Sequence, residues 1–318
     1  MRKYYGIDWL RSIACVGIMT MHVCANSNYE IDGFIYRQVI PSFTDFVFLF
    51  MAVSAFGMSC GYFDKVMEGK IDWTVFYKKR YSKILPFFLF LIVIDLVLDF
   101  SIQSLYEGFA EMTLLHGFIP QPLSVIGVGW FLGTVFIFYL IFPFFCVLIE
   151  NKRRAWCAFA VSILLNYVCS ENFSLERQNF LYSLCYFLAG GLVYLYRDRL
   201  QEVKWFVYLP IVAMAVVLYY LVGGNTVVQL FLTVSLLSFA ISVNCGKVGV
   251  ISYISEISME FYLSHMVVFR AIEKLHLHTR WGSGWGQYLI TTVLVFIGTV
   301  LFSFCFLKTT KKILNLEQ

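Results

Sequence analysis

Charged residues are scarce in this sequence. Asp, Glu, Lys and Arg make up 14% of the 318 residues, whereas soluble globular proteins carry about 25%. Hydrophobic residues make up 60%, above the usual level of about 45–50%, and the mean hydropathy is +0.75. These values exclude a soluble globular chain, and the modest net charge of +4 gives no indication of a nucleic-acid partner.

Paired cysteines are also lacking. The nine cysteines are scattered singly, with no C-x-x-C pair, and most lie within apolar runs. Zinc sites and disulfide frameworks require recurring cysteine spacings that this pattern does not offer. The sequence therefore predicts neither a metal site nor disulfides, and we expect the thiols to pack as small hydrophobic groups.

Apolar runs long enough to cross a bilayer, which takes about 20 residues, recur from end to end. They predict an all-α, polytopic transmembrane helix bundle that forms a single membrane domain over 1–318. We expect about ten spans, at 6–26, 41–62, 83–104, 126–149, 154–170, 178–196, 204–222, 225–244, 254–273 and 286–307. The longest segments between spans are 63–82 and 105–125. The second is apolar, contains His116, and is expected to dip into the membrane or cover a cavity.

Basic residues are distributed unequally between the two predicted faces. Eighteen Lys and Arg residues lie on the face that carries the termini, and the other face has only Arg37, Arg177, Lys274 and Arg280. Because cytoplasmic loops carry the excess of Lys and Arg, we expect both termini in the cytoplasm, in a bacterial inner membrane. A cleaved signal peptide at 6–26 is an alternative, but Asp8 and Arg11 would interrupt its apolar segment.

The first predicted helix carries two basic side chains at membrane depth. Arg11 and His22 are eleven residues apart, so at about 100° per residue they point in nearly the same direction, roughly 16 Å apart along the axis. Intramembrane ionisable residues usually face a bundle interior or a watery cavity and indicate function. Arginine can bind phosphate or a developing oxyanion, and histidine can remove a proton from a hydroxyl near neutral pH. A structural histidine with a snorkelling arginine is an equal alternative at this stage.

Five segments in a fixed order carry a family resemblance. The first is Asp8-x-Leu10-Arg11-x-x-Ala14 followed by His22, that is, an Arg, ten residues and a His. The others are 50–56 (FMAVSAF), 76–86 (FYKKRYSKILP), 129–143 (GWFLGTVFIFYLIFP) and 251–265 (ISYISEISMEFYLSH). Together they resemble the motifs of the membrane-bound acyltransferase-3 family. Two positions depart from the family pattern: Ala55 stands for the usual Gly of the second motif, and Lys83 for the commoner second Arg of the third.

The resemblance implies transfer of a short acyl group, usually acetyl, from cytoplasmic acyl-coenzyme A. The acceptor implied is a hydroxyl of a sugar or another envelope molecule, and acetyl-coenzyme A is then a co-substrate rather than a tightly bound cofactor. The resemblance makes His22 the general base and Arg11 the group that stabilises the donor or the oxyanion. It assigns the coenzyme A phosphates to Arg80 and Lys83, and Lys79 adds positive charge beside them.

Other polar residues have a functional and a structural interpretation each. Asp95 and Asp99 are four residues apart, on one face of a predicted helix, and could border the acceptor path or make a structural contact. His265 could line the cavity near His22, although a hydrogen bond to a neighbouring helix is the favoured interpretation. His116 is the best candidate for a second functional histidine. Trp130 is expected to pack first and to stack on a sugar second.

Two other classes of protein remain alternatives. Ten helices with buried charges also fit a membrane transporter or exporter, although the two related halves common in transporters are not visible. A non-catalytic member that keeps the fold is a third hypothesis, since fold does not fix function. The sequence identifies neither the acceptor nor the oligomeric state. A homo-oligomer is one of the alternatives.

Overall fold

The computed structural model describes residues 3–119, 125–280 and 282–313, and these residues form helices and connecting segments without a strand. The predicted all-α architecture is confirmed. The chain divides into two compact units. Unit 1 comprises residues 1–10 and 48–246, and unit 2 comprises residues 11–47 and 247–318. Helix α1 (Tyr5–Ala25) and helix α3 (Phe46–Met67) each contribute to both units. Pro120 and Pro122 of the predicted outer loop lie outside the described residues.

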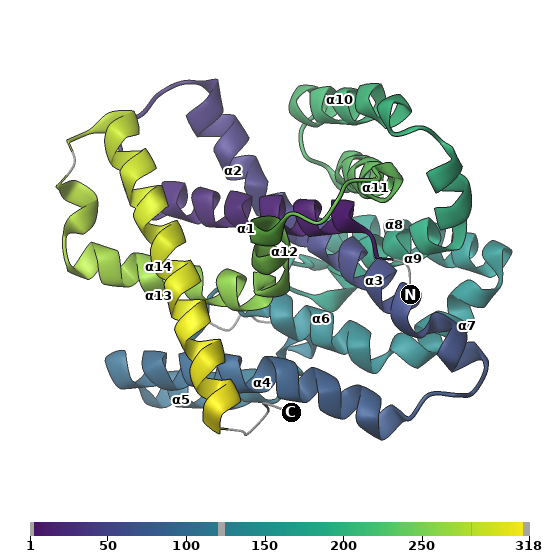
Figure 1. Ribbon diagram of the computed structural model, residues 1–318, viewed down its shortest axis with the longest axis horizontal. Coiled ribbons are helices and arrows are strands. Elements are labelled where there is room, and N and C mark those ends of the chain that lie inside the picture. The colour runs from purple at the N-terminus through teal and green to yellow at the C-terminus, as the bar shows by residue number, and fades with distance from the viewer. Residues whose placement is uncertain (1–2, 120–124, 281, 314–318) are drawn as a thin grey trace. The chain divides into compact units, whose positions relative to one another are not determined.

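Unit 1 contains most of the helices. After α3 they are α4 (Trp73–Leu98), α5 (Ile102–Met112), α6 (Trp130–Leu140), α7 (Phe142–Glu150), α8 (Lys152–Phe173), α9 (Phe180–Glu202), α10 (Trp205–Val222) and α11 (Thr226–Ser242), with a short 3₁₀ turn η3 (His116–Phe118) before α6. Within unit 1, α8 packs against α9, α9 against α11 and α11 against α10, and α4 lies beside α5 (Figure 1).

Helices α3, α6 and α9 run in the same direction through unit 1. Their N-terminal ends meet where Phe50 contacts Phe131 and Phe48 stacks on Tyr186, and further along α9 Tyr194 contacts the C-terminal half of α3. The close approach of α3 and α9 depends on Gly190, because a Cβ atom there would lie 2.1 Å from the carbonyl oxygen of Ala52. The N-terminal ends of the three helices therefore lie at one end of unit 1, and their C-terminal ends lie toward the other.

A bend of 60° separates α6 from α7. Pro143 occupies the first turn of α7 and has no N–H to continue the α6 ladder, which is the usual cause of such a break. The Leu140 carbonyl at the bend accepts a hydrogen bond of 2.9 Å from the Tyr77 hydroxyl of α4. The bend is thus built into the sequence and its freed polar group is satisfied by a neighbouring helix.

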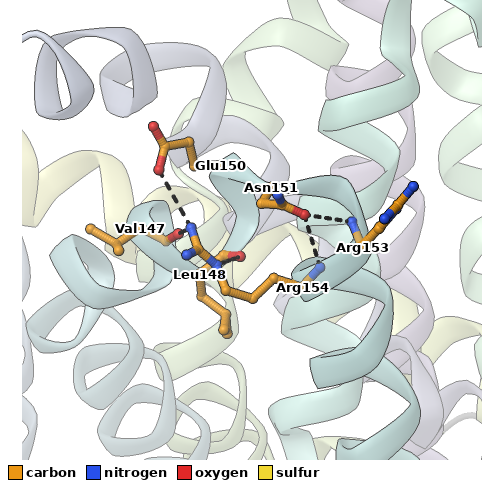
Figure 2. A network of polar contacts seen from close by, with 6 residues as sticks. All are labelled: Val147, Leu148, Glu150, Asn151, Arg153 and Arg154. Carbon is orange, nitrogen blue, oxygen red and sulfur yellow. Dashed lines mark hydrogen bonds and ion pairs between the residues drawn. The ribbon is translucent and has the colours of Figure 1, made fainter.

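The junction between α7 and α8 is held by polar contacts (Figure 2). Asn151 caps α8 by accepting hydrogen bonds from the backbone N–H groups of Arg153 and Arg154 at 2.9 and 3.2 Å. The Arg154 guanidinium donates to the carbonyls of Val147 and Leu148 and lies 3.4 Å from Glu150. Because the last carbonyls of a helix lack intrahelical partners, Arg154 stabilises the end of α7 as well as adding to the charge bias.

Unit 2 is formed by helices from both ends of the sequence. It contains most of α1, the short elements η1 (Ile35–Val39), α2 (Ile40–Ser42) and η2 (Phe43–Asp45), then α12 (Gly249–Glu256), α13 (Ser258–Lys274), η4 (Leu277–Thr279) and α14 (Gly284–Ile313). Helices α13 and α14 pack together (Figure 1). Tyr288 of α14 donates a hydrogen bond to the Thr20 carbonyl of α1, at 3.0 Å.

Each predicted span falls on a helix, but not every boundary was correct. Within the described ranges, five helical segments are long and apolar enough to cross a membrane, or six if α6 and α7 count as one bent span, so the count of ten stays a prediction. The third predicted span, 83–104, is wrong at both ends, because α4 begins at Trp73, where Asp72 caps it, and ends at Leu98. Residues 102–112 of the predicted apolar loop form helix α5, whose start Ser101 caps.

Candidate active site

His22 and His265 lie side by side in unit 2. Their ring centroids are 5.1 Å apart, with the ring planes tilted by 42°. The two helices that carry them run in the same direction, since Cys15 of α1 donates to the Ser258 carbonyl at the start of α13, and His22 and His265 follow seven residues later on each. His22 is half-buried, whereas His265 is 1% exposed.

The Nδ1 nitrogen of His265 makes a hydrogen bond within its own helix. The Nδ1 atom lies 2.6 Å from the carbonyl oxygen of Tyr262, and because a carbonyl can only accept, Nδ1 carries the hydrogen. The Nε2 atom therefore holds the lone pair, and it has no hydrogen-bond partner within the part of the chain that the structure describes. The expectation that His265 bonds a neighbouring helix is thus replaced by a bond within α13 and a ring contact to His22.

Arg11 lies three turns before His22 on the same unbroken helix. The prediction that the two share one face agrees with α1 being continuous from Tyr5 to Ala25. That face does not line an open cavity throughout its length, because Cys15 lies between them, is 1% exposed and packs against α13. Arg11 and His22 therefore lie at separate points about 16 Å apart along the helix axis, rather than around one atom.

Arg80 sits in an aromatic cage at one end of unit 1. Its guanidinium carbon lies 4.1 Å from the ring centroid of Phe76, 4.4 Å from that of Tyr62 and 5.8 Å from that of Tyr139. It also donates a hydrogen bond of 3.1 Å to the Tyr62 hydroxyl. Rings from α3, α4 and α6 thus fix the plane of the guanidinium while leaving N–H groups at its edge.

Lys79 and Lys83 lie on the same helix as Arg80. They are four residues apart, so they share one face of α4, and both are exposed, whereas Arg80 is half-buried. The sequence placed these residues in a loop or at the entry to a span, but the structure places them on the second and third turns of α4. A rigid helix therefore presents three positive charges around the aromatic cage.

The His116 side chain packs closely against the start of α6. Its Nε2 atom lies 3.1 Å from the Gly129 carbonyl, and the side chain is 5% exposed. The ring fits only because position 133 is glycine, since a Cβ there would lie 2.4 Å from the His116 Nε2 atom. Burial lowers the pKa of His116. The structure thus gives His116 a close packing role that the sequence did not predict.

Glu111 is a buried carboxyl close to His116. It is 1% exposed, and its Oε1 atom accepts a hydrogen bond of 3.2 Å from the Ile126 backbone N–H. Burial, helped by the nearby carboxyls of Glu107 and Asp95, raises the pKa of Glu111 to about 8 against the opposing effect of that hydrogen bond. Glu111 is therefore largely protonated at neutral pH. No sequence motif marks Glu111, because its burial depends on tertiary contacts such as that with Ile126.

Trp130 lies at the opposite end of unit 1 from the Arg80 cage. The guanidinium carbon of Arg177 is 5.3 Å from the Trp130 ring centroid and 5.5 Å from that of Phe48. The sequence predicted packing for Trp130, and the structure shows this contact with a cation. Arg177 itself was counted only as one of four basic residues on the predicted outer face.

Asp95 and Asp99 do not share a helical face. Asp99 follows the last residue of α4 with a non-helical backbone, φ −147° and ψ 73°, although its N–H still bonds the Asp95 carbonyl. Asp99 is exposed and Asp95 is half-buried near Glu111. The expectation that both lie on one face of a helix is wrong, because α4 ends at Leu98, one residue before Asp99. Among the described residues, no three His, Cys, Asp or Glu side chains are grouped as ligands of a metal.

The comparison with protein families matches the same residues that carry the motifs. The acyltransferase-3 family, described as an acyltransferase domain, matches residues 4–308. The chain belongs to this family. This acyltransferase-3 chain is also similar to the acyltransferase MdmB of Streptomyces mycarofaciens, at 28% identity over 35% of this chain and 33% of that protein. The alignment thus spans about a third of the length of that curated relative. No solved structure matches.

The chain therefore combines an acyltransferase domain with helices that are long and apolar enough to cross a membrane. The Arg11 and His22 of the family motif both lie in unit 2, and the basic motif at Arg80 lies in unit 1. Neither Arg177 nor Glu111 lies in any of the five motif segments. For Arg177 one signal was available: a basic residue on the predicted outer face runs against the charge bias.

Proposed function

We propose that this acyltransferase-3 protein transfers a short acyl group, acetyl in the first instance, from acyl-coenzyme A to a hydroxyl of an envelope carbohydrate. The observation that carries the proposal is the His22–His265 pair, with ring centroids 5.1 Å apart, in which His22 belongs to the Arg and His motif of α1. The charge bias supports a cytoplasmic donor side and an outer acceptor side in a cell membrane.

His22 acts as the general base in this proposal. It removes the proton from the acceptor hydroxyl as that oxygen attacks the thioester carbonyl carbon and forms a new C–O bond. The tetrahedral intermediate then collapses with cleavage of the C–S bond, and the protonated His22 returns its proton to the departing thiolate. The products are the acyl ester and free coenzyme A, so no oxidant or further reactant is required.

Arg11 serves the donor rather than the oxyanion. The unbroken α1 separates it from His22 by three turns, about 16 Å, which is farther than an arginine side chain reaches. Because hydrogen-bond donors for an oxyanion must lie about 3 Å from the reacting oxygen, Arg11 cannot serve an oxyanion formed beside His22. We assign it to the extended coenzyme A arm, which is long and carries acceptor groups along its length.

Arg80, Lys83 and Lys79 bind the coenzyme A phosphates in this proposal. The aromatic cage holds the guanidinium plane of Arg80, so its N–H edge is pre-organised for a planar pair of phosphate oxygens. Lys79 and Lys83 are exposed on the same helix and add point charges. Lysine in place of a second arginine at position 83 loses the bidentate geometry but keeps the charge.

His265 positions His22. With its Nδ1 hydrogen bonded to Tyr262, its Nε2 lone pair is available to accept a hydrogen bond from an imidazole N–H. A centroid separation of 5.1 Å leaves room for such a bond, directly or through one water. This contact would fix which nitrogen of His22 carries the hydrogen, and the other nitrogen would then act as the base.

The experiment that tests the function separates donor binding from transfer. Purified full-length protein in detergent is titrated with acetyl-coenzyme A by calorimetry, and release of radiolabelled acetyl from the same donor is followed with methyl glycosides as acceptors. We expect His22→Ala to bind the donor normally and to lose transfer by about 10²–10⁴-fold. The combined Arg80→Ala and Lys83→Ala variant should instead bind the donor more weakly.

His276→Asn is the matched control. His276 is an exposed histidine in a left-handed backbone conformation, φ 52°, which asparagine tolerates, so neither binding nor transfer should change. Failure of the folded wild-type protein to bind acetyl-coenzyme A would overturn the proposal and favour the transporter hypothesis. Normal donor binding with full transfer by His22→Ala would overturn the role of the base.

A further inference from the structure

Helix α5 carries large apolar side chains on its outer face. Four of them, spaced i, i+3, i+4 and i+7 so that they share one face, are exposed and are called the α5 stripe below: Ile102, Leu105, Tyr106 and Phe109. The opposite face carries Gly108 and Glu111, which are buried. A helix on the surface of a soluble protein has the reverse orientation, with its apolar face against the core. The α5 stripe therefore indicates an apolar partner.

Helix α5 folds back along the end of α4 (Figure 1). The two helices are joined by the short segment 99–101. A glycine at position 108 allows their close approach, because a Cβ there would lie 3.1 Å from a side-chain atom of Ile92 and 3.5 Å from one of Leu96. Ile92 lies six residues before Leu98, the last residue of α4, which is about 9 Å along the axis. Helix α5 thus runs antiparallel beside the last turns of α4.

Helix α4 determines the medium at this level. It is one of the segments that are long and apolar enough to cross a membrane, and most of it is not buried within the protein. Val93 and Val97, on the turns beside which α5 lies, are exposed, and in a membrane such side chains contact lipid. The α5 stripe continues this apolar surface at the same depth.

The length and charge of α5 limit how it can lie in the membrane. Its 11 residues extend about 16 Å, whereas the hydrocarbon core of a bilayer is about 30 Å thick. The helix therefore enters one leaflet without crossing. It contains no Lys or Arg, so attraction to anionic headgroups does not hold it there, and apolar contact with acyl chains does.

The inner end of α5 satisfies its polar groups within the protein. The Thr113 hydroxyl donates to the Ala110 carbonyl at 2.7 Å and accepts from the Leu115 N–H at 3.1 Å. The Leu114 N–H donates to the Glu111 carbonyl at 3.0 Å, and Leu114 is 0% exposed. Because the bilayer core offers no water to backbone groups, they must find partners in the protein. These residues meet that requirement.

We propose that α5 is a re-entrant helix in the outer leaflet and that the α5 stripe binds the acyl chains of phospholipids. The charge bias assigns the C-terminal end of α4, and with it α5, to the outer side. A second copy of the chain fits the stripe less well, because a stable interface buries about 1,200–2,000 Å² and four side chains on one short helix do not supply that area. The contact is independent of the acyl donor and acceptor.

Site-specific photo-crosslinking tests this contact on full-length protein in phosphatidylcholine nanodiscs. The crosslinking residue p-benzoylphenylalanine replaces Tyr106 or Phe109, each 66% exposed, so its larger ring displaces no packed group. Val97 of α4 is the positive control. Gln103 is the matched control, because it is exposed on the same helix but lies outside the stripe, where it bonds Glu107. Intact mass identifies lipid adducts, and fragmentation assigns them to acyl chain or headgroup.

We expect acyl-chain adducts at Tyr106 and Phe109, in yields similar to that at Val97, and a much lower yield at Gln103. Absence of acyl-chain adducts at both stripe positions would overturn the proposal, whether or not Val97 gives them. Adducts to headgroups alone would place α5 on the membrane surface and overturn its re-entry. Crosslinks between two chains in place of lipid adducts would identify a second copy as the occupant and overturn the proposal. An equal yield at Gln103 would overturn the assignment to one face.

A second measurement does not depend on the crosslinking residue. Combined Tyr106→Glu and Phe109→Glu should lower the midpoint of thermal unfolding in the same nanodiscs by about 5 °C or more, because charged side chains are costly in lipid. Exposed side chains in water would tolerate the same change with little effect. Gln103→Glu is the control and should leave the midpoint unchanged. An unchanged midpoint in the double variant would overturn the proposal.

Discussion

The imidazole rings of His22 and His265 lie with their centroids 5.1 Å apart, and the Nδ1 atom of His265 is bonded to the Tyr262 carbonyl within α13. Two histidines separated by 243 residues in the sequence thus form one pair. The first prediction concerns the partner of the proposed base. His265→Leu should lower kcat by about 10–100-fold, and donor affinity should not change.

His265→Gln provides the control for this prediction. Glutamine keeps a hydrogen-bond acceptor, so it should restore part of kcat, which a purely structural role for the ring would not explain. Steady-state kinetics with calorimetric donor binding checks both variants. Equal losses in the Leu and Gln variants, or a loss of donor affinity in either, would contradict a positioning role.

The second prediction concerns the aromatic cage of Arg80. Tyr62→Phe keeps the ring but removes the hydroxyl that accepts a 3.1 Å hydrogen bond from Arg80. Acetyl-coenzyme A affinity should fall about 3–10-fold, since a typical hydrogen bond contributes about 0.5–1.5 kcal/mol net and the three ring contacts of Arg80 remain. Tyr167→Phe, at a tyrosine that is 65% exposed, should leave the affinity unchanged. An unaltered affinity in Tyr62→Phe would separate the cage from donor binding.

The third prediction follows from the buried carboxyl of Glu111. Its pKa is raised from 4.5 to about 8 in the folded protein, so between these values the folded state binds more protons than the unfolded state. Stability therefore falls as the pH rises from about 4.5 to 8 and levels off above that range. The midpoint of thermal unfolding, followed by tryptophan fluorescence at several pH values, should show this fall.

Glu111→Gln should flatten the pH dependence, because the amide does not titrate and can still accept from the Ile126 N–H. Glu171→Gln removes an exposed carboxyl and should retain the slope of the wild-type protein. A wild-type slope in Glu111→Gln would show that other groups, such as Asp95 or Glu107, cause the dependence.

The fourth prediction tests the fit of His116 against α6. Gly133→Ala would place a Cβ 2.4 Å from the His116 Nε2 atom and disturb its contact with the Gly129 carbonyl. We expect destabilisation of about 1–3 kcal/mol, the usual range for overpacking. Gly127→Ala is the control, because a Cβ there meets no atom within 4 Å. Equal unfolding midpoints for the two variants would show that the ring of His116 moves aside at little cost.

The fifth prediction distinguishes adjacent arginines at the start of α8. The Arg154 side chain bonds the carbonyls of Val147 and Leu148, whereas Arg153 contributes its backbone N–H to the Asn151 cap (Figure 2). Arg154→Ala should therefore lower the unfolding midpoint, by an amount equivalent to about 1 kcal/mol. Arg153→Ala removes the same charge and should have little effect. The two variants should differ in stability alone, with unchanged orientation in the membrane.

The sequence by itself determined the features that depend on neighbouring residues. Hydropathy and the absence of strand signals predicted the helices, because backbone hydrogen bonds in a membrane must be satisfied within the segment. The helical period placed Arg11 and His22 on one face, and the motif spacings indicated the acyltransferase-3 family, which the match over residues 4–308 confirms. Boundaries were less accurate where a cap decides them: Asp72 caps α4, which begins at Trp73, ten residues before the predicted span.

Only the tertiary structure decided which distant residues meet. His265 lies beside His22, Tyr62 and Tyr139 enclose Arg80, and Phe48 and Trp130 hold Arg177. The burial of Glu111 and the glycine at position 133 that admits His116 are likewise invisible in the linear sequence. The physical reason is that such contacts follow from the packing of helices far apart along the chain, and helix packing depends on how side-chain surfaces fit together rather than on local periodicity.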